Sequence, residues 1–511
     1  MSLEELIRQR REKLGAWRAL GIEPYAYRYE VSHHVAEILA LGDQVTEADG
    51  PRVRVAGRLM SLRGHGKAGF AHLLDGTGKL QLYFRADRLE GAFQRYELLD
   101  VGDWIGAEGA VFRTRTGEIT VRVEGFSMLA KSLRPLPEKW HGLRDPETRF
   151  RQRYADLFMN LEVREVFRRR ARLIATLRRG LDERGYLEVE TPVLQPLYGG
   201  AFARPFVTRH HALDMDLYLR ISNELYLKRL LVGGLDRVYE FSRDFRNEGM
   251  DRSHNPEFTM LEYYQAFADL GDMLELTEAL VSRAVESAGA VPAPEGREIG
   301  WLPPFARLSM LDALSERLDA DVRGLETTPL AALAAKHGVA VRPEVGAGGL
   351  IDALFGELIQ PGLLQPTFVL DYPAEVSPLA RASRRHPGLV ERFELFAGGM
   401  EIANAFSEQN DPDEQRHAFE EQMARRARGD EEAQMMDLDY LRALEYGMPP
   451  AGGVGIGIDR LCMLVANAHS IRDVILFPQL RPEEGRLEAE DGTAAGAPPG
   501  AAAAPGRTPP R

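Results

Sequence analysis

The chain of 511 residues is too long for a single hydrophobic core, so we expect two or three domains. Its composition, 44% hydrophobic and 28% charged, is typical of a globular protein, and no run of about 18 apolar residues predicts a membrane span. The net charge of −13 argues against general adhesion to nucleic acid but leaves room for local basic patches.

The single cysteine and the N-terminus indicate where the protein works. Cys462 cannot form an internal disulfide or a multi-cysteine zinc site, so we expect no zinc. It lies in the apolar run "RLCMLVANA", which predicts a buried, unreactive thiol. The first residues, "MSLEELIRQRREKL", alternate acids and bases and lack an apolar signal core. We therefore expect a cytoplasmic protein.

Residues 1–48 are predicted to be mainly helical, with basic side chains gathered at the start. This cluster fits either a solvated helix face or a contact with phosphate groups. Its members are Arg8, Arg10, Arg11, Lys13 and Arg18.

Residues 49–133 change to the two-residue period of β-strands. The stretches "RVRVAGRLM", "KLQLYFRA" and "EITVRVEG" alternate apolar with polar side chains, and turn sequences such as "DGTG" separate them. Short alternating strands over about 80 residues predict a small closed barrel. Apolar positions predicted to face inward include Val53, Val55, Leu59, Leu80, Leu82, Phe84, Ile119, Val121 and Val123.

The outward phase of these strands carries rings and polar groups together. Single-stranded nucleic acid suits such a face, because bases stack on rings and polar groups read base edges. An exposed phenylalanine with no role is the alternative, since single exposed apolar residues are common. The outward group includes Arg58, Phe70, His72, Gln81, Tyr83, Glu118, Thr120 and Arg122.

The rest of the chain is predicted to form one large domain over 149–484, after a proline-rich linker at 134–148. It opens with a helix ended by Gly185, followed by the strand "YLEVETPVL", and it contains a helical insertion near 309–360. Residues 485–511 are rich in Ala, Pro and Gly and are predicted to be a disordered tail.

The stretch "DFRNEGMDRSHNPEFT" lies between two strand-like segments of this domain. Arg246 and Glu248 leave the first strand, His254 lies in the loop, and Phe258 begins the next strand. A charged, solvated turn would explain these residues, but cations beside a ring that can stack also suit a nucleoside triphosphate.

A second stretch is "RFELFAGGMEIANAFSE". If Gly398–Gly399 form a two-residue hairpin turn, Glu394 lies opposite Ala403 and shares a face with Glu401. Two such carboxylates favour Mg²⁺ held together with substrate phosphates, whereas the alternative is two solvated glutamates. Strand alternation would place Asn404, Phe406 and Glu408 on the other face unless the strand contains a bulge.

The third stretch, "GGVGIGIDRLCMLVAN", places Arg460 at the start of a helix. The helix dipole and the guanidinium both favour a phosphate there, and the glycines permit close approach of the backbone.

Together these stretches resemble parts of the class II aminoacyl-tRNA synthetases, a class defined by three sequence motifs. "FRNEGMDRSHNPEFTMLEYYQAF" is similar to the second motif, "GIGIDRLCML" to the third, and the helix and strand ending in "EVETPVL" to the first. Within the class, the blocks "GGAFARPF", "NELYLKRLLVGG", "QPTFVLDYPAEVSPLA" and "IRDVILFP" resemble lysyl-tRNA synthetases. The resemblance covers about residues 5–484, and the "DRS" before His254 departs from the usual pattern.

The resemblance implies a role for each residue. Arg246 would contact the ATP α-phosphate and the lysine carboxylate, while Glu248 and Phe258 would bind the adenine. His254 and Arg460 would reach the outer phosphates, and Mg²⁺ would lie between Glu394 and Glu401. The lysine would be bound by Gly200, Glu224, Arg246, Glu262, Tyr264, Asn404, Phe406 and Glu408, and the anticodon by Arg58, Phe70, Gln81 and Glu118.

The implied fold is α+β, an antiparallel-sheet catalytic domain preceded by an OB-type barrel, in a homodimer with Pro192 at the interface. The implied activity is ATP-dependent formation of lysyl-adenylate, followed by transfer of lysine to tRNA(Lys), with Arg246 and Arg460 catalytic. A ligase for aspartate or asparagine is an alternative, which the acidic Glu408 disfavours. A nucleic-acid-binding protein without the chemistry is another, which the intact arginines and glutamates disfavour.

Overall fold

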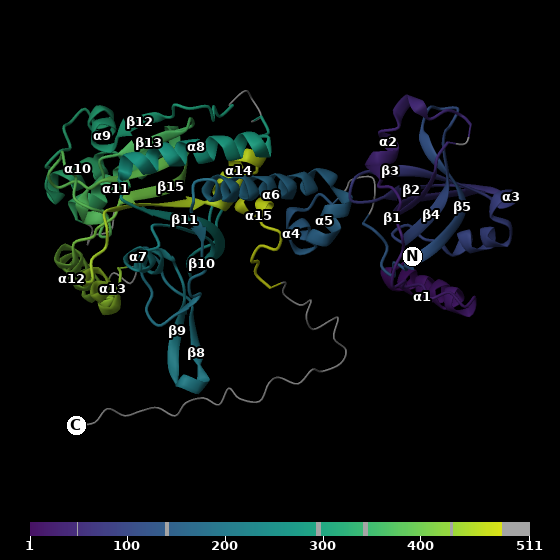
Figure 1. The fold of residues 1–511 in the computed structure, drawn as a ribbon, viewed down its shortest axis with the longest axis horizontal. Coiled ribbons are helices and arrows are strands. Elements are labelled where there is room, and N and C mark those ends of the chain that lie inside the picture. Colours follow the sequence, from purple (N-terminus) through teal and green to yellow (C-terminus); the bar gives the residue numbers. More distant parts are fainter. Residues whose placement is uncertain (49, 138–142, 293–297, 341–345, 430–432, 483–511) are drawn as a thin grey trace. The chain divides into compact units, whose positions relative to one another are not determined.

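The chain folds into two compact units, Met1–Asp145 and Pro146–Arg511. A computed structural model shows them (Figure 1) and describes residues 1–48, 50–137, 143–292, 298–340, 346–429 and 433–482. The tail expected at 485–511 lies outside the described residues. None of the helices in the described part combines the length and apolar character needed to cross a bilayer.

The first unit contains the expected barrel. Five strands close in the order β1-β2-β3-β5-β4, with β3 and β5 parallel and the remaining paired strands antiparallel. The predicted inward positions form its core, except that Ile119 is only partly buried. Alternation did not single out β4, whose residues are mostly buried. The strands are β1 Arg52–His65, β2 Ala68–Leu74, β3 Lys79–Arg85, β4 Trp104–Arg113 and β5 Ile119–Ala130.

The N-terminal segment is only partly helical. α1 covers Leu3–Ala19 and α2 covers Val35–Leu39, and the residues between them form no helix. Arg10, from the basic cluster, is buried and donates to the carbonyl oxygens of Val101, Ser132 and Arg134. This arginine therefore anchors α1 to the barrel. α3 Ala86–Leu89 follows β3.

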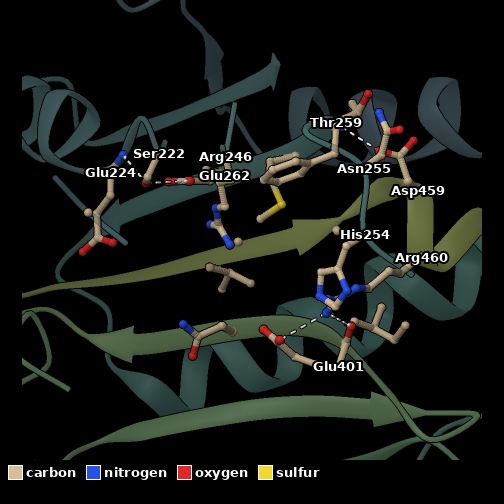
Figure 2. Close-up of a pocket in the computed structure, with 18 of the residues that line it drawn as sticks. Ser222, Glu224, Arg246, His254, Asn255, Thr259, Glu262, Glu401, Asp459 and Arg460 are labelled. Atoms are coloured by element: carbon tan, nitrogen blue, oxygen red, sulfur yellow. Dashed lines mark hydrogen bonds and ion pairs between the residues drawn. The ribbon is translucent and has the colours of Figure 1, made fainter. Parts of the chain in front are cut away.

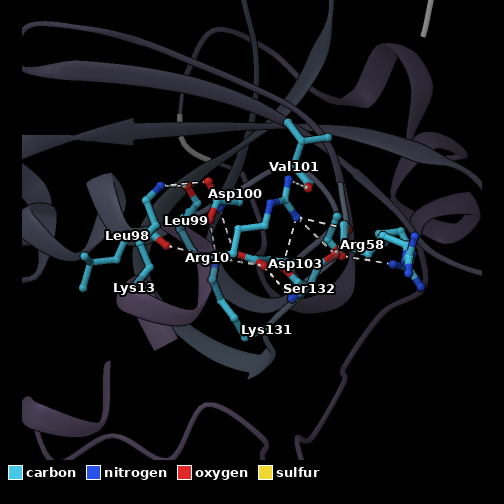
Figure 3. A network of polar contacts seen from close by, with 12 residues as sticks. Arg10, Lys13, Arg58, Leu98, Leu99, Asp100, Val101, Asp103, Lys131 and Ser132 are labelled. Atoms are coloured by element: carbon cyan, nitrogen blue, oxygen red, sulfur yellow. Dashed lines mark hydrogen bonds and ion pairs between the residues drawn. The ribbon is translucent and has the colours of Figure 1, made fainter. Parts of the chain in front are cut away.

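A buried ionic network joins the ends of β4 and β5 (Figure 3). Lys131 has no exposed side-chain surface, and its Nζ lies 2.8 Å from Asp103 Oδ2 and 2.5 Å from Asp100 Oδ2. Asp103 is also fully buried and accepts a hydrogen bond from the Ser132 backbone N–H. Burial raises the pKa of Asp103, and Lys131 opposes that rise. Lys13 of α1 adds a second, partly exposed cation at Asp100.

Lys131→Ala is expected to lower the free energy of unfolding by about 3–5 kcal/mol, because it leaves the Asp103 carboxylate buried without its cation. Lys13→Ala is the matched control. It removes a lysine from the same network, but one whose side chain is 32% exposed, so a loss of about 0–1 kcal/mol is expected. Denaturant unfolding measures both values, and equal losses would contradict the role given to Lys131.

The second unit is built on a sheet of eight strands, antiparallel except at its two ends. Its order is β12-β13-β14-β15-β16-β11-β10-β6. The strands are β6 Leu187–Glu188, β10 Arg237–Phe245, β11 Glu257–Ala266, β12 Ala306–Ser309, β13 Thr367–Leu370, β14 Arg392–Ala397, β15 Met400–Ser407 and β16 Ala451–Gly457. A three-stranded sheet beside it contains β7 Leu194–Gln195, β8 Val207–His210 and β9 Met215–Leu219.

Helices α6, α8 and α14 pack on this sheet around a shared apolar core (Figure 1). α6 buries Leu173, Leu177 and Leu181 at helical spacing, and Gly185 follows it with a positive φ of 77°. The helices of this unit are α4 Pro146–Arg151, α5 Arg153–Met159, α6 Leu161–Asp182, α7 Glu224–Val232, α8 Leu270–Ala288, α9 Met310–Leu318, α10 Thr327–Lys336, α11 Ala347–Leu358, α12 Pro412–Ala427, α13 Leu438–Glu445, α14 Ile458–Ala466 and α15 Ile471–Val474.

The strand expected over "YLEVETPVL" is broken into β6 and β7. Pro192 lies between the two pieces and has no N–H to donate to a ladder, which accounts for the interruption. Both Pro192 and its neighbour Val193 are exposed.

Candidate active site

A cavity of about 210 Å³ opens above the centre of the large sheet, between β11, β15, β16 and the start of α14 (Figure 2). Residues from well-separated stretches of the sequence line it, including nearly every residue predicted for nucleotide and amino-acid binding. These are Gly200, Glu224, Arg246, Glu248, His254, Phe258, Glu262, Tyr264, Glu401, Asn404, Phe406, Glu408 and Arg460.

A β-bulge explains how both phases of β15 reach one cavity. The turn at Gly398–Gly399 is as predicted, with positive φ at both glycines, and Phe396 pairs with Glu401. The register then shifts, so Glu394 pairs with Asn404 and the predicted pairing with Ala403 is wrong. The extra residue rotates the strand. Glu401 therefore shares a face with Asn404, Phe406 and Glu408, as their common cavity shows.

Cations and acids alternate at the exposed end of the cavity. The Arg460 guanidinium lies 2.9 Å from His254 Nε2 and 3.2 Å from Glu401 Oε2. On its other side, His254 Nδ1 is 2.8 Å from Asp251 Oδ2. This end can neutralise phosphate groups, because Arg460 also stands in the first turn of α14, where the helix dipole favours anions.

Arg246 and Phe258 lie between the two ends of the cavity. The hairpin of β10 and β11 brings them together, and the Arg246 guanidinium lies 5.0 Å from the centre of the Phe258 ring. Arg246 Nε donates to the Ile221 carbonyl oxygen at 3.4 Å, which leaves its remaining N–H groups for a ligand. Glu248 is exposed in the loop that follows.

Asp459 fixes this geometry, although the sequence analysis did not single it out. Its Oδ2 accepts from the Thr259 backbone N–H at 2.7 Å, and its Oδ1 accepts from Arg170 of α6 at 2.5 Å. Arg170 also donates to the Thr259 hydroxyl. These bonds tie α6, β11 and α14 together directly beside Phe258 and Arg460.

The other end of the cavity holds buried carboxylates. Glu262 is 5% exposed and accepts from the Ser222 and Tyr264 hydroxyls at 3.2 and 2.9 Å. Burial raises its pKa well above the usual value, and the nearby negative charges of Asp244 and Glu224 raise it further. This end of the cavity would stabilise a bound cation, because its carboxylates are buried away from solvent and a nearby positive charge would stabilise their ionised form.

Glu408 lies on the floor of this end and is 1% exposed. Burial raises its pKa to about 8, and the positive charge of Lys228 opposes the rise. Gly453 of β16 keeps the floor open, since a Cβ there would lie 2.2 Å from Glu408 Oε1 and 2.3 Å from the Tyr264 ring. Gly200 has a φ of +85°, which favours glycine, and a Cβ there would lie 2.8 Å from the Ser222 hydroxyl.

Lys228 is a further polar residue of this end that sequence reasoning missed. It is fully buried, with its Nζ 2.5 Å from Glu224 Oε1 and in contact with Glu408 Oε2. The available signal was a lysine inside the apolar segment "ELYLKRLLV", four residues after a glutamate and hence on the same helix face.

Glu394 lines a second cavity of about 950 Å³, which shares His254, Glu401 and Arg460 with the first. The Glu394 carboxylate pairs with Arg392 and accepts from the Tyr372 hydroxyl at 2.9 Å. Burial raises its pKa to about 7; Arg392 opposes this, and the charges of Glu401 and Asp352 add to it.

These carboxylates fit a divalent cation, because a positive ion between them would relieve their repulsion. Within the described ranges, no cluster of three or more His, Cys, Asp or Glu side chains has the arrangement of a metal site. Sites for Mg²⁺ commonly use only one or two carboxylates, together with substrate phosphates.

On the barrel, Phe70 is 41% exposed and stacks on Tyr83, with ring centres 4.6 Å apart. Gln81 Nε2 donates to Glu118 Oε2 at 2.7 Å, and the Thr120 hydroxyl donates to Gln81 Oε1. These contacts fix the orientation of the Gln81 amide and cover Thr120. Thr120 is fully buried, although the alternation along its strand predicted that it would point outward.

Arg58 lies against a different part of the barrel from the Phe70 stack. Its guanidinium is 5.1 Å from the Trp104 ring centre and donates to the Gly102 carbonyl oxygen.

Comparison with known families agrees with the two folds. Residues 145–481 match the model of tRNA synthetases class II (D, K and N), and residues 53–129 match that of an OB-fold nucleic acid binding domain. The chain belongs to the class II tRNA synthetases of this D, K and N group.

Curated relatives of high sequence identity are ligases for one amino acid of this group, lysine. A lysine–tRNA ligase of Pelotomaculum thermopropionicum is 54% identical over 94% of this chain and 96% of the relative. Those of Carboxydothermus hydrogenoformans and Moorella thermoacetica are 54% and 52% identical, over 94% of this chain and 99% and 98% of the relatives.

Proposed function

We propose that this protein activates L-lysine with ATP to form lysyl-adenylate and pyrophosphate, and then transfers the lysyl group to the 3′ end of tRNA(Lys). The observation that carries the proposal is the polarity of the cavity. One end offers buried carboxylates to the two ammonium groups of lysine, and the other offers Arg460 and His254 to phosphates. Arg246 lies between them, where the carboxylate and the α-phosphate would meet.

The first step needs no nucleophile from the protein, because the lysine carboxylate itself attacks the α-phosphorus. Bringing two anions together is the main obstacle, and catalysis consists of positioning and charge neutralisation. Arg246 would bind the lysine carboxylate and the α-phosphate, and Arg460 and His254 would bind the outer phosphates. Phe258 would stack on the adenine, and Glu248 would accept a hydrogen bond from it.

Buried charge favours lysine over the other amino acids of the group. Glu224 and Glu262 suit the α-ammonium, while Glu408 and Tyr264 suit the ε-ammonium, with Asn404, Phe406 and Gly200 shaping the wall. A substrate carboxylate placed beside Glu408 would cost several kcal/mol unless it were paired, which disfavours aspartate and leaves asparagine without a matching partner. Mg²⁺ would be held by Glu394 and Glu401 and would supply further positive charge at the phosphates.

Lysine-dependent exchange of pyrophosphate into ATP tests the proposal directly. We expect exchange with lysine, and at least a hundredfold less with aspartate or asparagine at equal concentration. Exchange that is indifferent to lysine would refute the proposal.

We propose that the barrel binds the tRNA anticodon through Phe70, Gln81 and Glu118, with Arg58 at the edge of the contact. The exposed ring stack and the fixed Gln81 amide support this, since one offers a stacking platform and the other a hydrogen-bonding edge.

Phe70→Ala is expected to lower tRNA charging efficiency roughly five- to a hundredfold, because stacking one base contributes about 1–3 kcal/mol. Exchange without tRNA should stay near normal, because lysine and ATP bind in the other unit. Tyr27→Ala removes a fully exposed ring of the same unit outside this cluster and serves as the control. Unchanged charging by a stable Phe70→Ala protein would remove the anticodon role.

We also propose a cytoplasmic homodimer joined near Pro192. The support is a group of exposed apolar side chains around it, which a partner could cover; Leu187, Val193 and Leu194 are 51%, 40% and 47% exposed. Sedimentation of the purified protein would determine the oligomeric state, and a monomer at micromolar concentration would exclude the dimer.

A further inference from the structure

Two acids that line the proposed lysine pocket are already paired with a cation that belongs to the protein. Lys228 lies within α7, one turn after Glu224, and is fully buried. Its Nζ pairs with Glu224 Oε1 at 2.5 Å and with Glu408 Oε2. A buried ammonium is costly unless it is paired in this way. Glu224, Lys228 and Glu408 therefore form one charged group, which we call the buried triad.

Glu408 presents the triad to the cavity floor. Its two oxygens differ in charge pairing: Oε2 forms the ion pair with Lys228 Nζ, and Oε1 does not. Neither oxygen accepts a hydrogen bond of regular geometry from the described residues. The missing side chain of Gly453 makes room for Oε1 itself, because a Cβ at that position would lie only 2.2 Å from this oxygen. The triad therefore offers one acceptor atom to a substrate and holds the other with its own lysine.

The charges of the triad suit one further cation. With both carboxylates ionised, two negative charges and one positive charge leave a net charge of −1, which a single ammonium would neutralise. Without Lys228, the same volume would hold two carboxylates and no cation. Two buried carboxylates that close together hold a proton more tightly than the triad does, and a protonated Glu408 distinguishes an ammonium from a hydroxyl much less well.

We propose that Lys228 is a specificity-determining residue for the amino-acid substrate: by holding Oε2, it favours the carboxylate form of Glu408 and directs Oε1 at a cationic side chain. This inference rests on the proposed function. Lys228 acts through Glu408 and not by touching the substrate, so it is a positioning residue.

The charged and titratable groups facing Glu408 give the expected pH dependence. They are Glu224 and Lys228 on α7, Tyr264 on β11 and Tyr440 on α13. Burial raises the pKa of Glu408; Lys228 lowers it and Glu224 raises it further. Both tyrosines have raised pKa values and stay neutral. Removing Lys228 should therefore raise the pKa of Glu408, and a higher pH should restore the carboxylate.

The test compares L-lysine with 6-hydroxy-L-norleucine, in which a hydroxyl replaces the ε-ammonium, by pyrophosphate exchange at pH 7.0 and 8.5. The ratio of their kcat/KM values isolates recognition of the ε-group, because the α-ammonium and carboxylate are common to both. In Lys228→Met we expect this ratio to fall by about tenfold or more, as for loss of a charge-assisted hydrogen bond. The KM for ATP should change less than threefold. Lys228→Gln keeps a polar side chain and provides the same measurement if the methionine variant does not fold.

Two further readouts separate charge from packing. The ratio should recover at least partly at pH 8.5, and it should recover in the double variant Lys228→Met/Glu224→Gln, which returns the group to a net charge of −1. Loss of the α-ammonium contact of Glu224 cancels in the ratio. A folded variant whose ratio stays within threefold of wild type overturns the inference, as does a reduced ratio that neither pH nor the double variant restores. A wild-type protein without lysine-dependent exchange would instead refute the proposed function.

Discussion

Replacing Arg246 with alanine is expected to slow lysine-dependent pyrophosphate exchange by about two to three orders of magnitude, the effect of removing one donor worth roughly 3–4 kcal/mol at a developing charge. Arg246 lies between the acidic end of the cavity and the end lined by His254 and Arg460, with its guanidinium held over Phe258. Arg460 is the other arginine that lines the cavity among the described residues, and it is engaged with His254 and Glu401 at the exposed end.

Steady-state exchange kinetics, with a melting curve for each protein, measure this effect. The control is Arg283→Ala, which removes an exposed arginine of α8 paired with Glu183; its exchange rate should stay within about twofold of wild type, since exposed pairs contribute little. Exchange at a near-normal rate in a well-folded Arg246→Ala protein would show that Arg246 does not bind the reacting groups.

Glu408→Gln is expected to raise the KM for lysine about ten- to a hundredfold, because a hydrogen bond to a charged group contributes about 1.5–3 kcal/mol. The change keeps the shape of the side chain and removes its charge. The KM for ATP should hardly change, since the phosphates lie at the other end of the cavity. A separation of the two KM values is therefore the diagnostic result.

Glu445→Gln gives the same chemical change at an exposed ion pair with Arg416 and should leave both KM values unchanged. The pH dependence provides a second check on Glu408. Burial raises its pKa to about 8, so lysine should bind more tightly as the pH rises from 6.5 to 8.5 and the carboxylate ionises. Parallel losses for lysine and ATP in Glu408→Gln, or lysine binding that ignores pH, would place Glu408 outside the amino-acid pocket.

Local sequence was sufficient to predict the strands and turns that form the site. The two-residue alternation marked three barrel strands, and the Gly398–Gly399 pair marked a hairpin whose glycines both adopt positive φ. The bulge between Glu401 and Ala403 was not predictable, because "MEIANAF" contains no glycine or proline and the shift is visible only in the pairing with β14. The need for a bulge, however, was foreseeable, because alternate side chains of a regular strand point to opposite faces and could not all line one cavity.

Contacts between residues far apart in the sequence were the other feature that could not be predicted. Lys228 of α7 and Glu408, which directly follows β15, are far apart in the sequence, and only the tertiary fold brings them into contact. The same holds for Arg170 and Asp459, which join the first and third motif-like stretches. Periodicity identifies the face on which a side chain lies, but it does not identify a distant partner.

Gly453 has no side chain, and this single feature affects two properties of the pocket: the length of the amino acid that fits and the recognition of its charge. A single methyl group there would shorten the pocket, but it would lie 2.2 Å from Glu408 Oε1, the oxygen that we propose recognises the substrate's charge, and would displace it. A descendant of this enzyme could not move to a shorter amino acid through a small change at this position while still recognising an ammonium. Glycine at 453 therefore protects fidelity, because the simplest substitution that favours a smaller substrate also weakens the recognition of a cationic one.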